Sequence, residues 1–400
     1  MNYSGGIIMK KLLSFTAIIL CFSLMLCSCA PTQSQGGDTP KNNIDNSDKN
    51  KEENENQSKL NVITPSAYSN IADLKLEPGS YISIIGRYAD DSFWSEVEAG
   101  AKQAVADINK MLGYKGDDQI KLVYNAPDIR DDVNEQINIL GEELSRYPIA
   151  IGIAAIDTSA CALQFDLAAE DSIPIITFDS GSDYQNVASH ISTNNLEAAS
   201  TAASKLAHAL DGAGEIAIIV QDSVSMTASE RLQGFTDTLA AQFPEISVVA
   251  TYHMDQLSTM AETIANEKNL GLAEGEEQMD PASISQEDVI QYILEKNPNL
   301  KGIYTTNLDT TQLVADVVTS SEETDLKIVG FDGGEEQLKL LEDGVVEGLV
   351  LQNPYGMGYA TVVAAARAAL DLGNESVVDT GYTWVTKDNM DTASIKQMLY

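Results

Sequence analysis

Apolar segments alternate with amphipathic helical patterns along most of this chain, and this alternation restricts its fold more than any other feature. Strand-like segments alternating with helices indicate βαβ units and parallel sheets. The strands are too numerous for one modest sheet, so the sequence predicts an α/β protein with two doubly wound parallel-sheet lobes. The predicted strands are Tyr81–Gly86, Ile120–Tyr124, Ile149–Ala155, Pro174–Phe178, Val187–Ile191, Glu215–Val220, Ser247–Tyr252, Gly302–Thr306, Leu326–Phe331 and Val346–Leu351. The helices, recognised by apolar residues three and four apart, are Phe93–Leu112, Asp131–Ser145, Asn195–Leu210, Ala228–Ala241, Thr310–Ser320, Glu335–Glu342 and Tyr355–Leu372.

The first sixty residues indicate export and anchoring rather than a folded domain. An apolar run from Leu12 to Leu26 follows two lysines, and it is shorter than the roughly 20 residues that a membrane span needs, so it predicts a secretory signal. The sequence around Cys29 resembles a bacterial lipoprotein box, which makes residues 1–29 a lipoprotein signal peptide and Cys29 the lipidated residue. An ordinary cleaved signal is the alternative, and translation starts at Met1 or Met9.

Residues 30–60 are almost entirely polar and charged, so they cannot bury enough apolar surface to fold. We expect a disordered tether there, which holds the protein outside the cytoplasm at the cell membrane.

The charge and the cysteine content exclude several classes of protein. Sixty acidic residues against 24 basic ones give a formal net charge of −36, which repels nucleic acid. Once Cys21, Cys27 and Cys29 are assigned to the export segment, Cys161 is left alone, so no internal disulfide is expected and this thiol should be an inert part of the core. The acidic segment Gly271–Gln286 lacks the spacing of a calcium loop, so it predicts a surface insertion without a metal.

Polar side chains recur at one kind of place, just beyond the carboxyl end of a predicted strand. In open α/β sheets ligands bind beyond these strand ends. Any one of these residues alone would more often cap a helix or form a turn, but their shared location favours a site for a small polar molecule. The residues are Asp91, Asp179, Ser180, Asn307, Asp332 and Gln352.

Three further residues complete the predicted site. Arg231 lies in the first turns of a helix, where the helix dipole disfavours a cation, so we expect a ligand nearby; a solvated surface arginine is the alternative. Phe93 and Trp94 begin another helix, where an exposed ring would stack on the C–H face of a sugar and a buried ring would belong to the core. Carboxylates accept hydroxyl protons while arginine and amides donate, so the set suits a polyhydroxylated ligand.

These motifs, in this order and at these distances, resemble the periplasmic binding protein type 1 family. The branch that they resemble includes the ribose-, galactose- and xylose-type sugar-binding proteins of ABC importers. The resemblance runs from about Tyr81 to Met390. Its motifs are Phe93-Trp94 with Gly100-Ala101, Ile173–Ser180, Arg231–Phe235, Ile303–Asn307, Val329–Gly333, Gln352–Pro354 with Met357–Tyr359, and Val385–Asn389.

The resemblance implies two lobes joined by a hinge of three strands. The crossings would lie near Ile191–Thr193, Gln352 and Thr380–Thr383. Lobe 1 would contain residues 80–191 and 353–381, and lobe 2 residues 192–352 and 382–400. Asp91, Phe93, Trp94 and Asp179 would bind from lobe 1, Arg231, Asn307 and Asp332 from lobe 2, and Gln352 from a crossing.

Two departures from the family pattern leave the particular sugar open. Family members often have arginine directly after the aspartate that ends the Pro174-containing strand, and this chain has Ser180 there. Asparagine-aspartate is usual where this chain has Asn307-Leu308-Asp309.

The expected function is that of a monomeric extracytoplasmic receptor that captures a sugar or polyol by lobe closure and delivers it to an ABC permease. A receptor that signals to a sensor kinase or chemoreceptor is the alternative. A glycoside-processing enzyme using Asp179 and Asp332 is a minor one. The sequence lacks a Gly-x-Ser-x-Gly elbow and a His-Glu-x-x-His motif, and its histidines are His190, His208 and His253, so we expect neither catalysis nor a cofactor.

Overall fold

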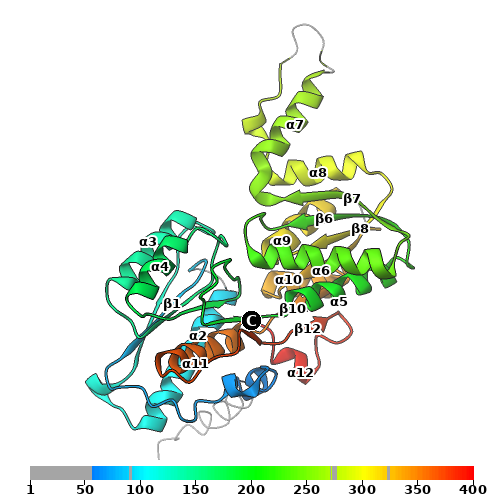
Figure 1. Ribbon diagram of the computed structural model, residues 1–400. Helices are drawn as coiled ribbons and strands as arrows, with labels where there is room; N and C mark the ends of the chain where they lie inside the picture. Colours follow the sequence, from blue (N-terminus) through cyan, green and yellow to red (C-terminus); the bar gives the residue numbers. More distant parts are fainter. Residues whose placement is uncertain (1–55, 90–91, 271, 273–276, 322–324) are drawn as a thin grey trace, which may run out of the picture. The chain divides into compact units, whose positions relative to one another are not determined.

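The computed structural model describes residues 56–400 except 90–91, 271, 273–276 and 322–324, and it contains two six-stranded sheets (Figure 1). Cys29 and Asp91 therefore lie outside the described residues. Within the described ranges, no helix is both long enough and apolar enough to cross a bilayer.

The first sheet is entirely parallel. Its strands, in spatial order, are β11 (Val377–Asp379), β5 (Ser189–Ser192), β4 (Ile175–Phe178), β3 (Ala150–Ile153), β1 (Tyr81–Ile85) and β2 (Lys121–Asn125). Its helices are α2 (Ser92–Leu112), α3 (Val133–Leu144), α4 (Ala162–Glu170) and α11 (Pro354–Ala369).

Helices α2 and α11 approach each other closely because each carries a glycine at the contact. A Cβ atom on Gly100 would lie 1.9 Å from the carbonyl oxygen of Tyr355, and one on Gly358 would lie 1.9 Å from that of Val97. The two backbones therefore touch directly, which brings the N-terminal ends of both helices together.

The second sheet repeats this plan with one antiparallel edge. Its order is β12 (Thr383–Val385), β10 (Gly348–Leu351), β9 (Lys327–Phe331), β8 (Leu300–Thr305), β6 (Gly214–Val220) and β7 (Ile246–His253), and β12 alone runs antiparallel to its neighbour. Its helices are α5 (Asn195–Ala209), α6 (Met226–Gln242), α7 (Leu257–Leu270), α8 (Gln286–Lys296), α9 (Leu308–Ser320), α10 (Glu335–Asp343) and α12 (Ala393–Lys396). Short 3₁₀ turns occupy Ser66–Ser69, Gly116–Asp118, Met254–Gln256 and Pro281–Ser283.

The chain passes between the sheets three times: from β5 to α5, from β10 to α11, and from β11 to β12. The predicted α/β fold with two doubly wound sheets and a three-strand hinge is therefore confirmed. The predicted strands all form, with ends that differ by a few residues. The two strands that the sequence did not reveal, β11 and β12, are only three residues long, which is too short for a readable alternation.

The N-terminal boundary differs from the prediction. Residues 56–61 are helical, and Leu60, Ile63 and Tyr68 are buried in the core that contains α2 and α11. The expectation of disorder as far as residue 60 is therefore wrong for the described residues 56–60. These apolar residues are too few to form a readable periodic pattern, but they pack in the core of the first sheet.

Cys161 directly precedes α4 and is buried, as expected of a core thiol, and burial raises its pKa to about 11. The acidic insertion connects α7 to α8 and lies partly outside the described residues. Its base is closed by Asn269, whose side chain accepts from the backbone N–H of Met279 at 2.7 Å and donates to its carbonyl at 3.1 Å.

Replacing Gly100 by alanine should destabilise the protein, because the new methyl group would overlap the backbone of α11. We expect a loss of at least about 2 kcal/mol in the free energy of unfolding, measured by urea denaturation. The control is Gly141→Ala in α3, where a Cβ would meet nothing within 4 Å and the change should be neutral or stabilising. Equal stability of the two variants would contradict the close helix contact.

Candidate functional site

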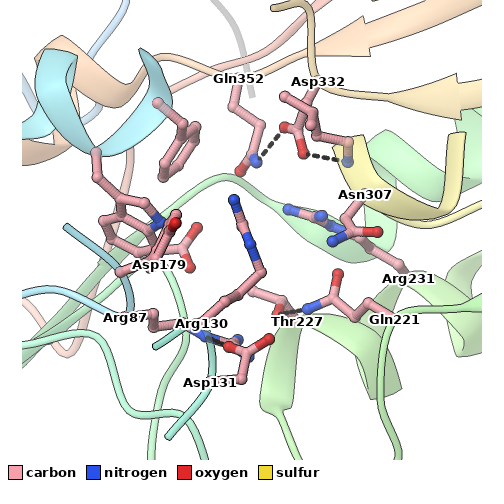
Figure 2. Close-up of a pocket in the computed structure, with 14 residues that line it drawn as sticks. Arg87, Arg130, Asp131, Asp179, Gln221, Thr227, Arg231, Asn307, Asp332 and Gln352 are labelled. Atoms are coloured by element: carbon pink, nitrogen blue, oxygen red, sulfur yellow. Dashed lines mark hydrogen bonds and ion pairs between the residues drawn. The ribbon is translucent and has the colours of Figure 1, made fainter. Parts of the chain in front are cut away.

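A cavity lies among the loops that follow the strands of both sheets (Figure 2). Several predicted site residues line it: Phe93, Trp94, Asp179, Arg231, Asn307, Asp332 and Gln352. Ser180 does not line it. That side chain is fully buried, and among the described residues its hydroxyl oxygen has no hydrogen-bond partner. Its neighbour Asp179 faces the cavity instead.

Asp179 presents a buried carboxylate to the cavity. It follows β4 with a positive φ of 53°, and its backbone N–H donates to the carbonyl of Ile191 at 2.9 Å. The residue is 7% exposed, and no described residue donates a hydrogen bond to its carboxylate. Burial raises the pKa of this carboxyl to about 6, although the nearby Arg231 and Arg87 oppose the shift. A buried acceptor without a protein donor is costly, and a ligand hydroxyl would satisfy it.

Asp332 occupies the corresponding place after β9 in the other sheet, also with a positive φ, of 69°. Its Oδ1 accepts from Gln352 Nε2 at 2.7 Å and from the hydroxyl of Tyr400 at 3.2 Å, while Oδ2 accepts from the backbone N–H of Leu308 at 3.1 Å. Gln352 is oriented in turn by the Thr193 hydroxyl, which donates to its Oε1 at 3.0 Å. This carboxylate is therefore fixed by the protein, in contrast to that of Asp179.

Arg231 is not a solvated surface residue, since it is only 2% exposed. Its Nε donates to Asn195 Oδ1 at 2.8 Å and its Nη1 donates to the carbonyl of Thr306 at 2.6 Å. The guanidinium lies 4.3 Å from the ring centroid of Phe331. These contacts hold the Arg231 side chain at the cavity wall. The remaining guanidinium nitrogen, Nη2, is left for the cavity (Figure 2).

Phe93 and Trp94 are both core residues and both line the cavity. Their rings pack edge to face with centroids 5.0 Å apart, and the ring centroids of Trp94 and Phe178 lie 6.3 Å apart. The ring centroids of Tyr400 and Phe93 lie 5.7 Å apart. Tyr400, which no local sequence pattern predicted, therefore supports both the aromatic Phe93 and the acidic Asp332.

Asn307 has the capping role that such residues often have, and it lines the cavity as well. Its Oδ1 accepts from the backbone N–H of Thr310 at 3.0 Å, which caps α9. Its Nδ2 donates to Asp309 Oδ2 at 3.3 Å.

Sequence reasoning missed several lining residues: Arg87, Tyr88, Arg130, Asp131, Gln221, Thr227 and Leu308. Arg87 and Gln221 follow β1 and β6, so their position at a strand end was a usable signal. Arg130 and Asp131 come from the loop before α3, and nothing in the local sequence marked them. Within the described residues, no cluster of three or more His, Cys, Asp or Glu could hold a metal ion.

Comparison with known proteins identifies the class of molecule to which this geometry belongs. Residues 82–375 match the family described as a periplasmic binding protein domain, so the chain belongs to that family. The prediction of a binding protein rather than an enzyme is thereby confirmed.

Individual relatives are similar over most of the chain. The D-apiose import binding protein of Actinobacillus succinogenes is 28% identical over 289 residues, covering 71% of this chain and 80% of that protein. The xylitol-binding protein of Mycolicibacterium smegmatis is 23% identical over 286 residues, covering 70% and 72%. A crystal structure of a carbohydrate transporter solute binding protein from Agrobacterium radiobacter, in complex with D-arabinose, is 28% identical with a TM-score of 0.66, covering 80% and 99%.

Asp179→Asn should stabilise the ligand-free protein at neutral pH. The folded pKa of about 6 lies above the unfolded value, so ionising this carboxyl removes stability as pH rises from about 4 to about 6. The asparagine variant avoids that loss, and we expect a gain on the order of 1–3 kcal/mol at pH 7 that vanishes near pH 4, measured by urea denaturation. Asp73→Asn is the control, since Asp73 is exposed and also has a positive φ, of 68°. A gain that does not change with pH would contradict the assignment.

Proposed function

We propose that this chain is an extracytoplasmic receptor that captures a neutral sugar or polyol between its two lobes and delivers it to an ABC importer. One observation carries the proposal. The carboxylate of Asp179, to which no described residue donates a hydrogen bond, comes from one sheet. The anchored groups of Arg231, Asp332 and Gln352 come from the other sheet and a crossing. A hydroxyl both donates and accepts, so a polyol can satisfy acidic and basic groups in one cavity.

The balance of charge in the lining favours an uncharged ligand. The described lining residues include Arg87, Arg130 and Arg231 against Asp131, Asp179 and Asp332, which is three positive and three negative side chains. An ionic ligand would leave one of these groups without a counter-charge in a poorly hydrated site. Phe93 and Trp94 offer apolar rings for the C–H face of a sugar. The apiose, xylitol and arabinose named for the related proteins belong to the same chemical class.

We propose that residues 80–191 with 353–381 move as one lobe and residues 192–352 with 382–400 as the other. The three crossings then form the hinge, and the ligand touches both lobes only when they close. Closure is favoured to the extent that the ligand binds the closed form more tightly than the open one.

The ligand class can be tested by thermal melting of the protein beginning at residue 56, screened with monosaccharides and polyols. A ligand at 100 times its dissociation constant should add about 2.7 kcal/mol of stability, which raises the melting temperature. Asp179→Asn should remove this response because an amide presents only one acceptor oxygen and adds an N–H in its place. Asp73→Asn should retain it. If no sugar or polyol raises the wild-type melting temperature, the proposed function is wrong.

We also propose that Cys29 carries a lipid and that the monomeric receptor is tethered to the membrane through residues 30–55. A single acyl chain gives only marginal membrane binding, so stable anchoring needs the several chains that a lipoprotein cysteine carries. In cells, the full chain should sediment with the membrane fraction, and Cys29→Ser should release it into the soluble extracytoplasmic fraction. Cys21→Ser serves as the control and should leave the protein on the membrane. Membrane association that survives Cys29→Ser would exclude this anchor.

A further inference from the structure

Two arginines from the loops of the first sheet reach aspartates in the loops of the second sheet. Arg87 follows β1, and its Nη2 lies 3.2 Å from Oδ2 of Asp222, which follows β6. Arg130 precedes α3, and its Nη1 lies 3.3 Å from Oδ2 of Asp309 in the first turn of α9. Both ion pairs therefore join the two proposed lobes, and both arginines line the cavity.

The Arg87 pair is buried and held in place from both sides. Asp131 Oδ1 accepts from Arg87 Nε at 3.0 Å and from Nη2 at 2.6 Å. Asp222 accepts from the backbone N–H groups of Val224 at 3.0 Å and Ser225 at 2.7 Å. Arg87 and Asp222 each keep partners within their own half, so of the bonds that these two side chains make, separation of the halves breaks only the one between them.

The Arg130 pair is more accessible to water. The side chains of Arg130 and Asp309 are 35% and 33% exposed. The Arg130 guanidinium lies 4.4 Å from the ring centroid of Tyr88, which restricts its direction. Arg130 lines both the cavity and a second hollow next to it, and Asp309 lines that hollow. The pair therefore lies where the ligand space adjoins the outside of the cleft.

We propose that Arg87–Asp222 and Arg130–Asp309 are positioning pairs: they form as the lobes close, and they strengthen ligand binding by stabilising the closed form rather than by contacting the ligand. This inference rests on the proposed function and deepens it. Since the ligand binds best to the closed form, any interaction that exists only in that form raises the measured affinity.

A dependence of affinity on salt follows for an uncharged ligand. A neutral sugar has no charge for salt to screen, whereas salt weakens the attraction between the opposite charges of each cross-cleft pair. The partly exposed Arg130–Asp309 pair should be screened more than the buried Arg87–Asp222 pair. We therefore expect the dissociation constant of the wild type to rise about two- to fivefold between low salt and about 0.5 M salt.

The test is calorimetric titration at both salt concentrations, with the saccharide that gives the largest melting shift. Arg130→Gln and Asp309→Asn should each weaken binding about two- to fivefold at low salt and flatten the salt dependence. The double variant should be no weaker than either single variant, and the exchanged pair Arg130→Glu with Asp309→Arg should recover part of the affinity. Lys102→Gln is the matched control, because it removes an exposed ion pair with Glu98 on α2, away from the cavity.

Several outcomes would overturn the proposal. One is a salt dependence that persists unchanged in the variants. Another is weaker binding in Arg130→Gln with unchanged binding in Asp309→Asn, which would mean that Arg130 contacts the sugar directly. If no sugar binds the wild type, the proposed function fails separately, and small-angle scattering of the ligand-free protein still tests the pairs. An interaction that exists only in the closed form also raises the population of that form without ligand. Arg130→Glu should therefore increase the radius of gyration of the ligand-free protein at low salt, and an unchanged radius would refute the cross-cleft role.

Discussion

Hydrogen bonds that tie the three chain crossings together are the constraint on which the rest of the structure depends. Asn353 Nδ2 donates to the carbonyls of Lys59 at 2.7 Å and Thr380 at 2.9 Å, while its Oδ1 accepts from the backbone N–H of Gly356 and caps α11. The neighbouring Gln352 joins Thr193 to Asp332. One asparagine and one glutamine thus connect all three crossings, and this arrangement gives the ligand cavity walls from both sheets.

The two halves place an aspartate at equivalent positions and use it differently. Asp179 and Asp332 each end a strand and each adopt a positive φ, which aspartate tolerates better than most residues. Asp332 already accepts three hydrogen bonds from the protein, so its orientation is set in advance. Asp179 is left without a donor among the described residues, and its raised pKa reflects the cost. Under the proposed function, a bound hydroxyl would recover the free energy lost at Asp179 in the ligand-free protein, so the instability and the affinity would have one source.

That cost is tolerable because the surrounding scaffold is rigid. Helices α2 and α11 touch backbone to backbone at Gly100 and Gly358, and α11 is buried along most of its length. The aromatic residues that begin α2 are therefore fixed by the core while they face the cavity. Rigid walls lower the ordering cost of binding, which leaves closure of the lobes as the main conformational change that the ligand must drive.

Much of the fold and of the candidate site could be predicted from the amino-acid sequence, and the features that could not be predicted have physical causes. Alternating strands and helices determined the fold class, and residues such as Asp179 and Asp332 were found because a strand end has a defined place in a parallel sheet. Ser180 was expected at the site but does not line the cavity. The backbone leaves the strand geometry at Asp179, which has a positive φ, and the sequence does not say which of the two adjacent side chains then faces the cavity. Only the tertiary structure decided that Arg87 meets Asp222, that Arg130 meets Asp309 and that Tyr400 supports Asp332. Those partners lie far apart along the chain, and their contacts depend on how two separate sheets face each other, which no local periodicity encodes.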